Sequence, residues 1–167
     1  MEGSEDFPAN DQQKAKGKKE KPDHIVRVIL IGDRAVGKSC LIQRYVNKRF
    51  TENSLATLGV DQFSKTSKIG DKLVKISIND TAGAESFKAL ASNYYKKADV
   101  VLILYDVTEK SSLKSVSGWV DSVEQMAKKD VVKYLVGNKI DLQKQVETKE
   151  AQDVAAKHGF KLIETSA

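Results

Sequence analysis

The sequence predicts an α/β fold in which six strands form one mostly parallel sheet with helices on both faces. Two observations lead to this prediction. From Ile25 onward, apolar runs of strand length alternate with stretches of helical length. Several runs, such as Val-Val-Leu-Ile-Leu-Tyr over residues 100–105, are apolar throughout, which is typical of strands buried on both faces. Strands that alternate with helices form parallel sheets covered on both sides.

The elements follow from the same patterns, in the order βα, ββ, αβ, αβ, αβ. The predicted strands cover residues 25–31, 63–69, 73–78, 100–105, 133–136 and 160–163, and the predicted helices cover residues 38–47, 112–128 and 148–158. Residues 48–60 have the composition of a loop. Gly70-Asp71 joins the second and third strands and is a hairpin signal, so these two strands should pair antiparallel.

The composition predicts one domain behind a polar tail. The chain has 167 residues, which is enough for one ordinary domain. Residues 1–24 contain both prolines and a lysine-rich run and cannot bury enough apolar surface to fold. The tail is either solvated or in contact with an acidic membrane or partner. The domain therefore spans residues 25–167.

Charge and cysteine content exclude several classes of function. The net charge is +5, but lysine and arginine are spread along the chain without interleaved aromatic residues, so we expect no nucleic-acid partner. A single cysteine, Cys40, excludes an internal disulfide and fits a reducing compartment. No apolar run reaches the roughly 18 residues of a membrane span. We expect a cytoplasmic protein.

A phosphate-binding motif lies between the first predicted strand and the first predicted helix. Residues 32–39 read Gly-Asp-Arg-Ala-Val-Gly-Lys-Ser and match G-x-x-x-x-G-K-[ST]. The glycines allow backbone N–H groups to surround phosphates, and the start of the helix favours anions. Lys38 can reach the β- and γ-phosphates, and Ser39 can ligate Mg²⁺.

A second motif, Asp80-Thr81-Ala82-Gly83, follows the third predicted strand. Ligands of open α/β sheets bind at the carboxyl ends of strands, so Asp80 is placed to hold Mg²⁺ through water. The alternative is that Asp80 caps the next helix. Gly83 can bring a backbone N–H close to a γ-phosphate.

Two further segments predict recognition of guanine. Asn138-Lys139-Ile140-Asp141 follows the fifth strand, and the Asp141 carboxylate can accept hydrogen bonds from the N1–H and the 2-amino group of guanine. Adenine lacks this pair of donors and would leave the carboxylate unpaired. Lys139 offers an aliphatic stem to the base. Thr165-Ser166-Ala167 follows the last strand and can bring N–H groups to the guanine O6.

Together these motifs resemble the small GTPases of the Ras superfamily, most of all the Rab branch, over residues 25–167. The resemblance implies a P-loop small G domain that binds GTP and GDP with Mg²⁺. It implies nucleotide contacts by Asp33, Arg34, Ala35, Val36, Gly37, Lys38, Ser39, Cys40, Phe50, Thr57, Gly83, Asn138, Lys139, Asp141, Ser166 and Ala167. It also implies Mg²⁺ ligation by Ser39, Thr57 and, through water, Asp80, and catalytic roles for Lys38, Thr57 and Gly83. Without the resemblance, Thr57 would be interpreted as a surface residue.

The same resemblance implies partners and a cellular role. Effectors, exchange factors and GTPase-activating proteins should bind through residues 51–63 and 81–97, and the activity should regulate vesicle traffic. Membrane contact in such proteins is peripheral and uses a prenylated C-terminal tail. The sequence ends at Ala167, before the family's last helix and that tail.

Four substitutions depart from the family pattern. Ala84 stands where the catalytic glutamine would follow Gly83, as a natural residue or as a replacement that holds GTP. Arg34 stands where relatives carry a small residue, and it either stabilises charge on the γ-phosphate or obstructs an arginine finger. Gln62 and Asn79 replace two aromatic residues of the usual effector surface.

Three functional hypotheses remain at this point. The first is a cycling GTPase, and the second is a GTP-binding module that recruits effectors but hydrolyses poorly. These two hypotheses differ in the effect on hydrolysis that they assign to Ala84 and Arg34. The third is a P-loop kinase or ATPase, which Asp141 and the lack of a recognisable phosphate-acceptor site disfavour.

Overall fold

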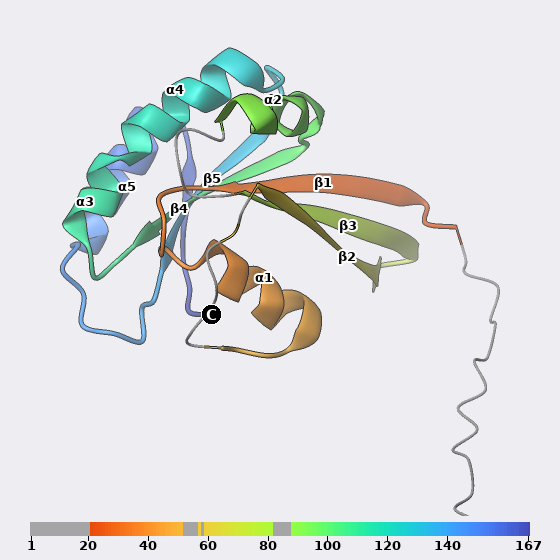
Figure 1. The fold of residues 1–167 in the computed structure, drawn as a ribbon, viewed down its shortest axis with the longest axis horizontal. Coiled ribbons are helices and arrows are strands. Elements are labelled where there is room, and N and C mark those ends of the chain that lie inside the picture. Colours follow the sequence, from red (N-terminus) through yellow and green to blue (C-terminus); the bar gives the residue numbers. More distant parts are fainter. Residues whose placement is uncertain (1–20, 52–56, 58, 82–87) are drawn as a thin grey trace, which may run out of the picture.

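The computed structural model describes residues 21–51, 57, 59–81 and 88–167. In this part of the chain six strands form one sheet in the order β2-β3-β1-β4-β5-β6 (Figure 1). The strands are β1 (His24–Ile31), β2 (Val60–Ile69), β3 (Lys72–Thr81), β4 (Val100–Asp106), β5 (Val132–Asn138) and β6 (Lys161–Glu164). Only β2 and β3 pair antiparallel among them, and the other pairs are parallel. The predicted mostly parallel sheet and its hairpin are confirmed.

Helices cover both faces of this sheet. They are α1 (Lys38–Asn47), α2 (Lys88–Lys97), α3 (Lys110–Lys114), α4 (Val116–Met126) and α5 (Thr148–Lys157). In Figure 1, α1 lies on one side of the sheet and α2, α4 and α5 lie on the other. None of the helices in the described ranges is long and apolar enough to cross a membrane.

Two apolar layers follow from the alternation of side chains along the central strands. Ile29 and Ile31 of β1 face one way and join Ile103, Trp119 and Tyr95 in a buried cluster. Val28 and Leu30, which alternate with them along β1, belong to a second cluster that also includes residues of helix α1 and of other strands. The buried members of this cluster are Val28, Leu30, Val36, Ile42, Ile78, Leu104 and Val136. Burial on both faces explains why the central strands are continuously apolar in the sequence.

The predicted helix over residues 112–128 is wrong in detail, because the structure divides it into α3 and α4 at Ser115. Glu109 caps α3 by accepting from the backbone N–H of Ser111. The Ser115 hydroxyl donates to the Ser111 carbonyl, and the Ser112 hydroxyl donates to the carbonyls of Asp106 and Glu109. Serine hydroxyls that bond to nearby backbone groups compete with regular helix formation, and the apolar periodicity does not reveal this.

Asp99 ties three segments together at the end of the sheet remote from the sequence motifs. It accepts from the backbone N–H of Arg27 at 2.9 Å and from the Lys128 ammonium at 2.8 Å. Partial burial alone would raise the pKa of Asp99, but these hydrogen bonds and the two positive charges outweigh it, so the pKa lies below its ordinary value. A carboxylate with a lowered pKa stabilises the fold above its unfolded-state pKa, and the contribution is lost as the pH falls.

We therefore expect Asp99→Asn to lower the free energy of unfolding by up to about 1 kcal/mol at pH 7, since the group is partly exposed. The difference from wild type should shrink as the pH falls from roughly 5 towards 2. Urea unfolding at several pH values measures it, with the exposed Asp130→Asn as the matched control. A pH-independent difference would contradict the assignment.

Candidate nucleotide-binding site

The predicted motifs meet at one edge of the sheet. The loop after β1 leads into α1, and Asp80, Asp106 and Asn138 lie at the carboxyl ends of β3, β4 and β5. These strands run parallel and are neighbours in the sheet. This is the edge at which open α/β sheets bind their ligands.

The loop between β1 and α1 is pressed against its neighbours. Gly32 has φ 136° and Gly37 has φ 94°. A Cβ atom on Gly32 would lie 2.3 Å from the Leu104 carbonyl oxygen, and a Cβ on Gly37 would lie 2.3 Å from Nδ2 of Asn138. Glycine is therefore required at both positions, by backbone conformation and by space. Ala35 is also left-handed, with φ 62°.

Lys38 lies buried inside this loop. Its ammonium donates to the carbonyls of Gly32 and Asp33 at 2.9 and 2.7 Å, and the residue is 6% exposed. Burial lowers the pKa of Lys38 to about 8, against the opposing charges of Asp80 and Asp33. The loop thus holds a cation where the motif places the phosphates.

Three oxygen-bearing side chains from separate segments converge beside Lys38. The Ser39 hydroxyl donates to Oδ2 of Asp80 at 2.5 Å, the Thr57 hydroxyl donates to the same oxygen at 3.3 Å, and the two hydroxyls lie 3.0 Å apart. Asp80 is 1% exposed, and burial raises its pKa although Ser39 and Lys38 oppose this. Its Oδ1 has no hydrogen-bond partner.

This donor set fits Mg²⁺. The ion prefers oxygen ligands and is usually held by one or two carboxylates with waters and phosphate oxygens. The described residues include no group of three or more His, Cys, Asp or Glu side chains placed for a metal, so a site here depends on the two hydroxyls. The buried, unpartnered Oδ1 of Asp80 is an acceptor that a metal-bound water can satisfy.

The two segments predicted to bind the base also lie together. The Ser166 hydroxyl donates to Oδ1 of Asp141 at 2.5 Å. The backbone N–H of Ile140 donates to the Thr165 carbonyl at 3.3 Å, and the N–H of Thr165 donates to the Gly137 carbonyl at 2.8 Å. Asp141 and Ser166 are both exposed, so their polar atoms face solvent where a ligand can enter.

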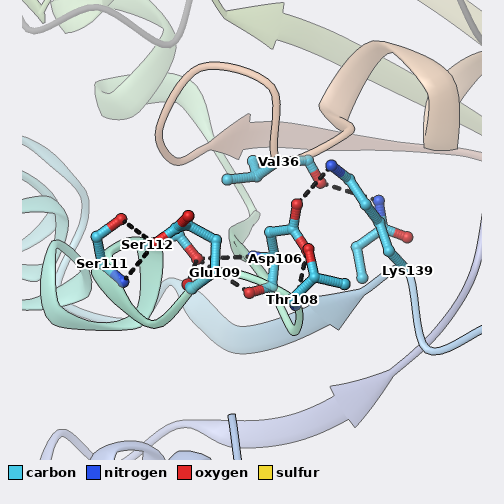
Figure 2. Close-up of polar contacts among 8 residues, drawn as sticks. Val36, Asp106, Thr108, Glu109, Ser111, Ser112 and Lys139 are labelled. Atoms are coloured by element: carbon cyan, nitrogen blue, oxygen red, sulfur yellow. Dashed lines mark hydrogen bonds and ion pairs between the residues drawn. The ribbon is translucent and has the colours of Figure 1, made fainter. Parts of the chain in front are cut away.

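Asn138 and Lys139 connect the base segment to the phosphate loop. Nδ2 of Asn138 donates to the Val36 carbonyl at 2.9 Å. The Lys139 ammonium pairs with Asp106 at 2.5 Å, and Figure 2 shows it reaching towards that carboxylate beside Val36. Asp106 also accepts from the backbone N–H and the hydroxyl of Thr108. Burial would raise the pKa of Asp106, but the bonds from Lys139 and Thr108 lower it below its ordinary value.

Sequence reasoning missed the roles of two residues near this loop. It assigned no contact to Asp106, although an acid at the carboxyl end of a central parallel strand is a signal that was available. It also missed Trp119 of α4, whose indole N–H donates to Oδ1 of Asp33 at 2.8 Å. No local pattern marks that contact, because 86 positions separate the two residues.

Several predicted residues lie apart from the buried cluster. Phe50 is 50% exposed, and the Arg44 guanidinium lies 5.7 Å from its ring centroid. Cys40 bonds weakly to the Thr51 carbonyl at 3.8 Å. Arg34 is exposed. Gly83 and Ala84 lie outside the described residues.

Gln62 and Asn79 lie directly opposite one another in the β2–β3 ladder. Nε2 of Gln62 donates to the Ser77 hydroxyl at 3.1 Å, and Nδ2 of Asn79 donates to the Val28 carbonyl at 3.4 Å. Asn79 is 6% exposed, and its Oδ1 has no partner. The two positions where the resemblance implies aromatic rings therefore carry neighbouring amides.

The family model of the Ras family matches residues 27–167. The chain belongs to the Ras family. This Ras-family chain is 41% identical over 150 residues to the Ras-related protein Rab-11C of Dictyostelium discoideum, covering 89% of this chain and 67% of the relative. It is 42% identical over 147 residues to Rab-2B of the same organism, covering 87% and 73%. The GTP-binding protein ypt2 of Schizosaccharomyces pombe is also 42% identical over 147 residues, covering 87% and 74%. The resemblance to Ras-family GTPases, and to Rab-type members in particular, is confirmed.

Proposed function

We propose that this Ras-family chain is a Mg²⁺-dependent switch that binds GTP and GDP, hydrolyses GTP weakly and regulates vesicle traffic. The observation that carries the proposal is the convergence of Ser39, Thr57 and Asp80 beside the buried Lys38 ammonium. Support for guanine comes from Asp141, which lies beside Ser166 at the same edge of the sheet. Its Rab-named relatives support a role in traffic.

Each group has a defined task in this proposal. Lys38 and the N–H groups of the loop bind the β- and γ-phosphates, and Asp141 accepts from the base. Ser39, Thr57 and, through water, Asp80 would hold Mg²⁺, which would supply charge neutralisation at the phosphates. In hydrolysis, water attacks the γ-phosphorus, the bond to the β-phosphate oxygen breaks, and GDP and inorganic phosphate leave.

The test of the nucleotide class is analysis of the nucleotide recovered from purified protein. GDP or GTP is the expected result, and removal of Mg²⁺ by EDTA should accelerate its release. Recovery of ATP or ADP would instead support the kinase or ATPase hypothesis and contradict ours. A second candidate function is a GTP-binding module that hardly hydrolyses GTP, and Ala84 supports it. Single-turnover rates of GTP hydrolysis separate this module from a cycling GTPase.

Thr57 is expected to make the site a switch. In the GTP state Thr57 would be a ligand of Mg²⁺, and after hydrolysis it would no longer hold the ion, so that residues 51–60, most of which lie outside the described residues, would be free to move. Backbone hydrogen exchange across residues 51–60 should therefore be slower with a non-hydrolysable GTP analogue than with GDP. Residues 148–157 of α5 serve as an internal control and should exchange alike in both states. Equal rates over residues 51–60 would count against a switch.

A further inference from the structure

We propose that Trp119 is a positioning residue for the phosphate loop: its indole N–H holds the Asp33 carboxylate and, through Asp33, the carbonyl that binds Lys38. The inference rests on the proposed function, because it concerns how the loop is prepared for phosphates. It assigns a role to a residue that the phosphate-binding motif does not contain.

Asp33 is held from two sides. Its side-chain Oδ1 accepts from Nε1 of Trp119 at 2.8 Å, and its backbone carbonyl accepts from the Lys38 ammonium at 2.7 Å. The preceding residue, Gly32, is held by its close approach to the Leu104 carbonyl. The hydrogen bond from Trp119 therefore constrains the Asp33 peptide, which in turn constrains where the Lys38 ammonium lies.

The Trp119 side chain is fixed in place by its packing in the apolar core. It is 5% exposed and belongs to the apolar cluster of α4, which also contains Val123 of the same helix and Tyr95 of α2. Helix α2 lies within residues 81–97, the segment expected to contact regulators. Trp119 thus connects the apolar layer beneath α2 with the phosphate loop.

Charge gives this contact a second effect. Asp33 is half-buried and negative, and a free carboxylate beside a triphosphate would repel it. An indole N–H is a donor only, so it fixes the carboxylate in one orientation and partly compensates its charge. In a partly buried site, a hydrogen bond to a charged group contributes more to stability than a hydrogen bond between two neutral groups.

The experiment uses the chain loaded with a fluorescent GDP analogue. Trp119→Phe keeps an aromatic ring in the cluster but removes the donor, and analogue dissociation should become roughly tenfold faster, as for the loss of one charge-assisted hydrogen bond. Asp33→Ala should also accelerate dissociation, but by less, because it removes the carboxylate's repulsion of the phosphates together with the hydrogen bond. Asp33→Asn retains an oxygen acceptor for the indole and should recover most of the slow dissociation. The double variant Trp119→Phe/Asp33→Ala should dissociate no faster than the faster single variant, because both remove the same contact.

Val123→Ala is the matched control for packing. It removes buried volume from the same helix and cluster and should lower the unfolding midpoint while leaving dissociation unchanged. A purely structural role for Trp119 would make Trp119→Phe behave like this control, and that result would overturn the inference.

Fluorescence adds an independent signature, because Trp119 is the only tryptophan of the chain. A negative charge beside the indole N–H stabilises the excited state, so Asp33→Ala should shift the emission to shorter wavelength in the nucleotide-free protein. Unchanged emission would show that the bond is absent in solution.

Failure of the wild type to bind any guanine nucleotide would refute the proposed function and this inference together. Normal binding with unchanged dissociation in Trp119→Phe would refute this inference alone.

Discussion

Asp141→Asn is expected to weaken GTP and GDP binding by about 10⁴-fold, the scale at which sites built around polar pairs reject a mismatched partner. In the proposed site the carboxylate accepts from both N1–H and the 2-amino group of guanine. An asparagine amide would place its own N–H₂ against one of these donors. Xanthine carries a carbonyl in place of the 2-amino group, so it can accept from that amide, and xanthosine triphosphate should gain affinity.

Equilibrium titration of both nucleotides against wild type and variant measures this exchange of specificity. Asp153→Asn, an exposed change of the same chemistry on α5, is the control and should leave both affinities unaltered. Asp141→Asn protein that binds GTP and xanthosine triphosphate as the wild type does would show that Asp141 does not read the base.

The second large effect concerns hydrolysis of bound GTP. Phosphoryl transfer to water depends on positioning and charge stabilisation, and the methyl group of Ala84 can neither orient water nor hydrogen-bond to it. Ala84→Gln is therefore expected to raise the single-turnover rate on the order of 10²-fold, the scale associated with correct placement of a reacting group. Nucleotide affinity should stay unchanged, because Lys38, Ser39 and Asp80 remain.

We expect Arg34 to decide whether an activating protein can increase the rate further. An arginine finger contributes roughly 10³ to 10⁵ in rate in small and heterotrimeric G proteins. Arg34 is an exposed residue of the phosphate loop, and we expect it to obstruct the entry of such a finger. Arg34→Gly in the Ala84→Gln background should then respond more strongly to an activating protein than Ala84→Gln alone.

Single-turnover rates for the wild type, both single variants and the double variant, with and without activating protein, separate these contributions. An Arg34→Gly single variant that hydrolyses GTP as slowly as the wild type would be consistent with obstruction. A variant that hydrolyses GTP more slowly than the wild type would instead show that Arg34 stabilises charge. A wild type already as fast as the double variant would refute both assignments and identify a cycling GTPase.

Much of the fold could be predicted from local patterns. The strand before the phosphate loop and helix α1 over Lys38–Asn47 were predicted nearly to the residue, because a buried parallel strand and an amphipathic helix have distinct periodicities. The start of β2 at Val60 instead of residue 63 was missed, since an edge strand with one exposed face has a weak apolar pattern. The break at Ser115 was missed because it depends on serine hydroxyls and not on periodicity.

The sequence by itself determined the chemistry of the candidate site: the phosphate loop, Asp80 and the 138–141 segment are short motifs whose residue types and neighbouring strands are local properties. Only the tertiary structure decided how these parts hold one another. The contacts of Trp119 with Asp33, of Ser39 with Asp80 and of Asn138 with Val36 join residues 86, 41 and 102 positions apart. Such pairs depend on strand order and on which helix lies over which strand, because the carboxyl ends of β1, β3, β4 and β5 must first be brought to one edge before their side chains can meet.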